Sequence, residues 1–138
     1  MKKISSAHAI ILFIIFCATA CTHDKLDNCG AGTSGNLTLN VFLQHGVHQV
    51  VNIKKYCDTV FIKYNVNESP GVNPSDYDTF FVGVYPGDSV CIPNLSCGHY
   101  FLFDVGFESN HSKRITGEMP FNTTQNSGTF NVTIQGTE

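Results

Sequence analysis

Apolar and polar residues alternate with a period of two over much of the chain beyond residue 36. The runs Leu37–Leu43, Thr59–Val66 and Thr129–Gln135 each place apolar residues at every second position. Successive side chains of a β-strand point to opposite faces of a sheet. The three runs therefore predict strands that turn one face to a core and the other to water.

Shorter runs rich in β-branched and aromatic residues predict further strands, at Val47–Ile53, Thr79–Tyr85, Ser89–Ile92, Tyr100–Phe107 and Lys113–Glu118. Turn-forming segments separate them, namely His45-Gly46, Asn67–Pro74, Pro86–Asp88, Pro93–Gly98, Ser109–Ser112 and Asn122–Gly128. The sequence past residue 36 has no helical stripe. The pattern predicts an all-β fold, a single sandwich of about seven strands.

The chain begins with a pattern typical of an export signal. Basic Lys2 and Lys3 precede an apolar run from Ala9 to Cys17, and small residues follow it. A membrane-spanning helix needs about 20 apolar residues, and the polar residues after Cys21 come too soon for one. We expect a signal peptide over residues 1–20, a Gly-rich flexible tether over 21–35 and one domain over 36–138.

The residues Ala18-Thr19-Ala20-Cys21 resemble the lipobox of bacterial, Bacteroidota-type lipoproteins. The resemblance implies cleavage before Cys21, acyl chains such as palmitate on that residue, and a location at the outer membrane or cell surface. Asp24 and Asp27 resemble acidic residues that favour surface display in that group. Ala18 replaces the usual Leu, so an ordinary signal peptide cut after Ala20 remains the alternative.

The composition and net charge of the mature domain limit the classes of partner that we expect. Apolar residues make up 42% of the chain and charged residues 14%, which suits a packed domain. Without Lys2 and Lys3, six of the eight basic residues remain against 11 acidic ones, a net charge of −5. Nucleic-acid binding needs clustered cations, so we expect the membrane, an envelope protein or a glycan as partner, and no nucleic acid.

The segment Val90–Phe107 reads VCIPNLSCGHYFLFDVGF. It resembles a signature of prealbumin-like domains, the Cna B-type and carboxypeptidase-regulatory-like group. The resemblance implies an immunoglobulin-like (prealbumin-like) sandwich in which Gly98 restarts a strand and Tyr100 and Leu102 point into the core. The group is structural or binding, so no catalytic residue follows from it. Some relatives form a core isopeptide bond, but Lys63 is expected on the outer face.

Four cysteines follow Cys21, and an even number in an exported domain suggests two disulfides. Cys91 and Cys97 flank a short turn, so we favour that pair. The alternative joins Cys57 to Cys91 and Cys29 to Cys97. A metal site is less favoured, because the Cys-x-x-Cys spacing is missing from the sequence.

Other metal or modification signals are weak. His45-x-x-His48, with His99 and His111 elsewhere, lacks the Glu of a metalloprotease motif. Asp76 and Asp78 are two oxygen donors for Ca²⁺, but turn-forming residues explain them equally. Asp58-Thr59-Val60 and Asp88-Ser89-Val90 resemble a short Bacteroidota O-glycosylation motif. We therefore expect no catalytic residue, metal or cofactor.

Three functions are compatible with these patterns. The first is a non-enzymatic binding or structural lipoprotein of the envelope. The second is a fimbrial or adhesin-type subunit, although the processing Arg of such precursors would have to be Arg114, the only Arg of the chain. The third, a small periplasmic metal-dependent enzyme, has no motif in its favour.

Overall fold

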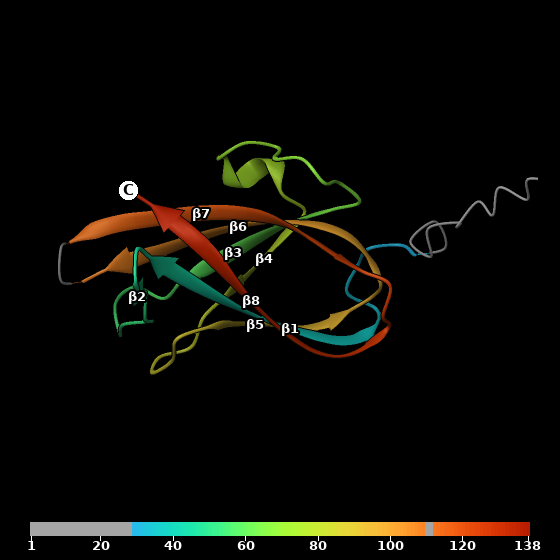
Figure 1. Cartoon of the computed structure of the whole chain (residues 1–138), viewed down its shortest axis with the longest axis horizontal. Helices are drawn as coiled ribbons and strands as arrows, with labels where there is room; N and C mark the ends of the chain where they lie inside the picture. Colours follow the sequence, from blue (N-terminus) through green and yellow to red (C-terminus); the bar gives the residue numbers. More distant parts are fainter. Residues whose placement is uncertain (1–28, 110–111) are drawn as a thin grey trace, which may run out of the picture.

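The computed structural model describes residues 29–109 and 112–138 (Figure 1). The expected signal peptide, Cys21 and His111 lie outside the described residues. The described chain forms the strands β1 (Asn36–His45), β2 (His48–Gln49), β3 (Thr59–Tyr64), β4 (Thr79–Val82), β5 (Val90–Leu95), β6 (Gly98–Glu108), β7 (Lys113–Thr123) and β8 (Ser127–Thr137), with a short 3₁₀ turn η2 (Pro74–Asp76). The all-β prediction is confirmed.

The strands form one curled, mixed sheet in the order β2-β1-β8-β7-β6-β3-β4, and β5 pairs with the free side of β1. β1 and β8 run parallel over ten residues, while the other pairings are antiparallel. β7 and β8 pair only at Thr116–Thr137 and Gly117–Gly136. The sheet can therefore fold over, so that β5-β1-β8 faces β4-β3-β6-β7 as two layers (Figure 1).

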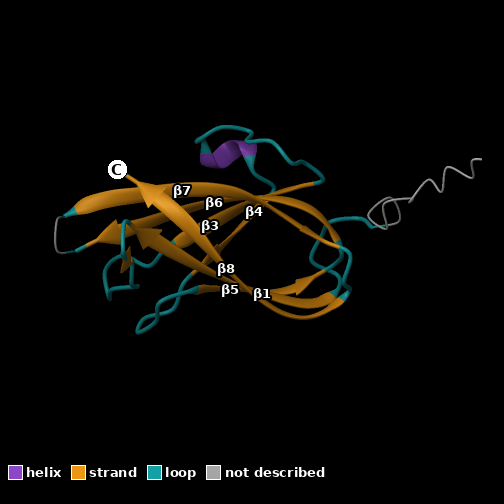
Figure 2. Cartoon of the chain, viewed as in Figure 1, coloured by secondary structure: helices purple, strands orange, loops and turns teal. Residues whose placement is uncertain are grey.

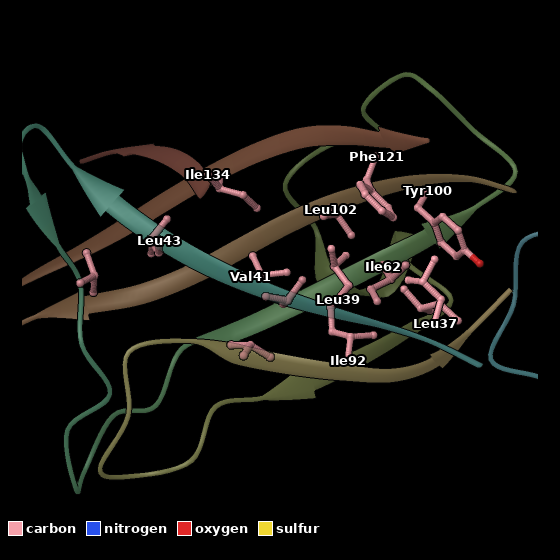
Figure 3. Packing of buried hydrophobic residues seen from close by; sticks show 14 of the residues in the cluster. Leu37, Leu39, Val41, Leu43, Ile62, Ile92, Tyr100, Leu102, Phe121 and Ile134 are labelled. Atoms are coloured by element: carbon pink, nitrogen blue, oxygen red, sulfur yellow. The ribbon is translucent and has the colours of Figure 1, made fainter. Parts of the chain in front are cut away.

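The core lies between these two layers. Leu37, Leu39, Val41 and Leu43 of β1 are at most 1% exposed, as the alternation predicts. They pack against buried residues of the opposite layer: Val60, Ile62, Tyr100, Leu102, Ile115 and Phe121. Figure 3 shows Leu37 and Tyr100 at one end of this core and Leu43 and Ile134 at the other.

Two element predictions need correction. Only His48–Gln49 of the predicted strand Val47–Ile53 pairs with β1 as a strand, because the rest of that side of β1 is taken by β5, and Asn52 and Ile53 form isolated bridges to Gly87 and Tyr56. β5 also continues to Leu95, through a segment predicted to be a turn. Pro93 is tolerated there because β5 is an edge strand, where no second neighbour needs its missing N–H group.

The first described residues lie against the end of the sandwich at which β6 begins. Cys29 forms a disulfide with Cys97, 68 residues further on. The hydroxyl of Tyr100 accepts a hydrogen bond from Gly32 N (3.1 Å) and donates to Ser96 O (2.7 Å). Residues 29–35, expected to belong to a flexible tether, are therefore part of the folded domain.

The disulfide corrects the favoured pairing of cysteines. Cys97 bonds to Cys29 and not to Cys91, and Cys57 and Cys91 are both free. Cys91 cannot close the β5–β6 turn because its side chain points outward on β5, whereas Cys97 is buried. The alternative pairing was right for Cys29–Cys97 only.

A second, smaller cluster covers part of the outer face of β3 and β6. Tyr77 stacks on Phe103, with 5.7 Å between ring centroids, and Phe61 and Phe101 pack beside them. Tyr77 directly follows η2, which lies on the outer side of this layer (Figure 2). The loop therefore covers one end of the outer face and leaves the other end open.

Candidate functional site

The open end of the outer face carries a hollow of about 360 Å³, lined by Lys55, Tyr56, Cys57, Thr59, Val105, Gly106, Phe107 and Arg114. We call it the basic–aromatic hollow, after Lys55, Tyr56, Phe107 and Arg114. Its residues come from the loop before β3, from the end of β6 and from the start of β7. A hollow with apolar walls and a few polar groups is the usual form of a ligand site.

Two aromatic rings in contact with each other line this hollow. The ring centroids of Tyr56 and Phe107 are 4.5 Å apart, and Tyr56 is 41% exposed. The ammonium group of Lys55 lies 5.2 Å from the centre of the Tyr56 ring, within the range of a cation–π contact. The rings thus place partly apolar surface beside the positively charged residues that line the hollow.

Arg114 lines the hollow from the neighbouring strand, β7. It is directly opposite Phe107 in the β6–β7 ladder and exposed, and it also lines a second hollow of about 360 Å³ with Val72, Phe103, Thr116 and Glu138. Among the described residues, the ion pairs of the lysines are Lys63–Asp78 and Lys113–Glu138, whereas Arg114 has no carboxylate within salt-bridge distance. Its guanidinium group is therefore available to an anion.

A pair of buried carboxylic acids lies directly behind the hollow. Asp58 and Asp104 are 1% and 0% exposed, and their side chains point to the inner face of the sheet. Asp58 Oδ1 is so close to the backbone of Gly106 that a Cβ atom there would lie 2.5 Å from it. We call Asp58 and Asp104 the acid pair.

None of the four carboxylate oxygens of the acid pair has a hydrogen-bond partner in the described structure. Burial raises the pKa of Asp58 to about 7. Burial and the nearby charge of Asp58 raise the pKa of Asp104 to about 8, and the backbone amide of Val105 offsets only part of this rise. Both acids consequently retain protons far above the usual pKa of a carboxyl group.

Asn52, in the loop before β3, holds the backbone of Asp58 in place. Its Oδ1 accepts a hydrogen bond from Asp58 N (2.6 Å), and its Nδ2 donates to Ser89 O (3.2 Å). The backbone N–H of Asn52 donates a hydrogen bond to Gly87 O, and an antiparallel β-bridge joins Ile53 to Tyr56. These bonds fix the segment Asn52–Asp58, which also carries Lys55, Tyr56 and Cys57 of the hollow.

The residues predicted as candidate ligands do not converge. His45 pairs with Glu108 (3.1 Å), His99 lies beside Asn67 and Asn122, and Asp78 accepts from Lys63 Nζ and Tyr64 N. Lys63 is on the outer face, as expected. Within residues 29–109 and 112–138 no group of three or more His, Cys, Asp or Glu side chains could hold a metal ion. No helix in this part of the chain is long and apolar enough to span a membrane.

The residue pattern of the sequence predicts neither the basic–aromatic hollow nor the acid pair. Tyr56 and Phe107 are 51 positions apart, and the register that joins β6 to β7 is not visible in the residue pattern. A signal was present for Asp104, because a carboxyl group interrupts the inward-facing series Tyr100, Leu102, Gly106.

We compared the chain with known protein families, with curated proteins and with solved structures, and no match was found.

Proposed function

We propose that this protein is an exported, lipid-anchored envelope protein whose β-sandwich is a non-enzymatic binding module. In this proposal Cys21 carries the lipid, the chain belongs with lipoproteins that have a prealbumin-like domain, and the basic–aromatic hollow binds the ligand. The observation that carries the proposal is the arrangement along β6. The strand starts beside the Cys29–Cys97 disulfide and ends beside the hollow.

The arrangement suits a module that is anchored at one end and binds at the other. At about 3.3 Å per residue, the 11 residues of β6 separate the two ends by roughly 33 Å. The N-terminal segment enters at the end with the disulfide, so a membrane anchor would leave the hollow facing away from the bilayer. The disulfide also favours an oxidising, extracytoplasmic compartment.

The lining of the hollow favours an acidic glycan as the ligand. Arg114 and Lys55 supply positive charge on a chain that is otherwise acidic, and a guanidinium group binds a carboxylate through paired, charge-assisted hydrogen bonds. The rings of Tyr56 and Phe107 offer a flat surface to the apolar face of a sugar ring. The Thr59 hydroxyl adds a neutral hydrogen-bonding group.

A binding titration with polygalacturonate, a polymer of uronic acid, tests this proposal, with neutral dextran of similar size as the reference ligand. We expect binding of the acidic polymer only. Arg114→Ala should weaken it about tenfold, equivalent to about 1.4 kcal/mol. Lys113→Ala is the matched control, since Lys113 is adjacent but paired with Glu138. Equal binding of dextran, or full binding by the Arg114→Ala variant, would contradict the proposal.

A further inference from the structure

The acid pair is costly to the fold unless something neutralises it. A buried carboxylate that has lost its hydration needs hydrogen bonds or a counter-charge. Neither acid faces a counter-charge among the described residues, and only the backbone amide of Val105, beside Asp104, partly stabilises a charge on the pair. Two ionised carboxylates side by side would also repel each other. The pair must therefore hold protons or a cation.

The surroundings favour protons. Apart from Asn52, whose side chain is bonded to Asp58 N and Ser89 O, the inner-face residues near the pair are apolar or glycine: Leu43 of β1, Val50, Val60 of β3, Gly106 of β6, Ile115 and Gly117 of β7 and Gly136 of β8. A calcium ion takes six to eight oxygen ligands. Within residues 29–109 and 112–138 no third His, Cys, Asp or Glu side chain joins the pair to build such a ligand set.

The other titratable groups on the inner face are closer to the solvent. His45 of β1 pairs with Glu108 of β6 at 3.1 Å, and it lies 3.9 Å from Glu138, which is bonded to Lys113 of β7. These four groups sit at the open end of the sandwich, beyond Gly106 and Gly136. From the loops, Cys57 is half-buried, and Lys54, Lys55, Tyr56 and Asp88 are exposed. No cation in the described chain faces the acid pair.

We propose that Asp58 and Asp104 form a proton-holding pair that keeps the segment Asn52–Asp58 closed on the sandwich, and that loss of these protons releases the segment. Asp58 ends this segment and contacts Gly106, so a charge on Asp58 acts at the point where the segment joins the core. The released segment would take Lys55 and Tyr56 out of the hollow. The proton-holding role stands by itself, while its effect on ligand binding rests on the proposed function.

The direction of the pH effect follows from proton binding. In the unfolded chain both carboxyl groups ionise near pH 4, whereas in the folded chain burial keeps their pKa values at about 7 and about 8. Between these limits the folded state binds more protons than the unfolded state. The stabilisation that protonation of the acid pair contributes to the folded state is therefore fully present below about pH 4. It is lost as the pH rises through 7 and 8.

Carbon-13 NMR of the side-chain carboxyl groups, recorded from pH 4 to 9 on the purified protein with its disulfide intact, tests the pair directly. We expect two aspartate resonances, assigned by Asp58→Asn and Asp104→Asn, with midpoints above pH 6. Over the same range the unfolding temperature should fall by at least about 5 °C, and amide hydrogen exchange should accelerate in residues 52–58. Asp88→Asn, an exposed control, should retain the wild-type profile.

Two results would overturn the proposal. One is that no aspartate carboxyl resonance of the wild-type protein has a midpoint above pH 6, which would show that the pair is solvated or ion-paired. The other is that EDTA lowers the unfolding temperature and Ca²⁺ restores it, which would assign the pair to a cation. Both readings use the wild-type protein, so they hold even if an Asn variant fails to fold. Neither the NMR result nor the EDTA result involves binding of polygalacturonate. The proton-holding role can therefore fail or hold independently of the proposed binding function.

Discussion

Gly106 is the residue at which the core, the acid pair and the hollow meet. A Cβ atom at this position would lie 2.5 Å from Asp58 Oδ1 and 2.6 Å from Leu43 Cδ2. Neither neighbour can withdraw easily, because both are buried in the sandwich. Only a residue without a side chain allows Asp58 and β1 to approach β6 so closely.

Gly106→Ala should accordingly destabilise the fold. Overpacking of a filled core costs about 1–3 kcal/mol, and we expect a loss of that size in the free energy of unfolding, measured with urea. The matched control is Gly30→Ala, because a Cβ atom at Gly30 meets nothing within 4 Å. Equal stability of the two variants would show that β6 is not in close contact with Asp58.

Residues that follow the alternation were predictable, and residues that depend on long-range contacts were not. The inward direction of Leu37, Leu39, Tyr100 and Leu102 follows from the period of two and from the signature segment. Asp58 shows the limit, since it stands in a short motif typical of an exposed glycosylation site. It is buried because it continues the inward-facing series of Val60 and Ile62.

At the scale of elements, the disulfide joins the segment before β1 to the turn between β5 and β6. Cross-linking residues 68 positions apart restricts the unfolded chain strongly. The Gly32 amide and the Tyr100 hydroxyl, with Gly35 N bonded to Asn94 O, hold the same segment against the sandwich. The disulfide thus secures the N-terminal end of the domain.

Removal of this disulfide should lower stability much more than removal of a free thiol. The chain-entropy relation gives about 4 kcal/mol for a loop of this length. We expect most of that loss in urea unfolding of Cys29→Ser, while Cys57→Ser should lose less than about 1 kcal/mol. A free thiol count of four in the denatured, oxidised protein, excluding Cys17 and Cys21, would instead mean that the bond is not formed.

Strand positions were predicted better than strand partners. The runs predicting β1, β3, β6 and β8 appear in the structure: β1, β6 and β8 extend one or two residues further at each end, and β3 ends at Tyr64, two residues before its run does. The failure at Val47–Ile53 has a cause that no local pattern contains, because one side of β1 is shared between β2 and β5. The parallel pairing of the first strand with the last likewise depends on the whole fold.

At the scale of the molecule, the two ends of the sandwich have different roles in our account. The end with the disulfide receives the segment that leads back toward Cys21. The other end holds the basic–aromatic hollow and, behind it, the acid pair. A lipid anchor at Cys21 would attach the molecule to the membrane from the disulfide end, since two or more acyl chains hold a protein stably on a membrane.

The most direct test of this account is the intact mass of the protein purified from the membrane fraction of cells that produce the full chain. The account predicts a chain that begins at Cys21 and carries the added mass of a diacylglyceryl group, with or without a further acyl chain. A mass equal to residues 21–138 without an adduct, or to the uncleaved 138-residue chain, would contradict the lipid anchor.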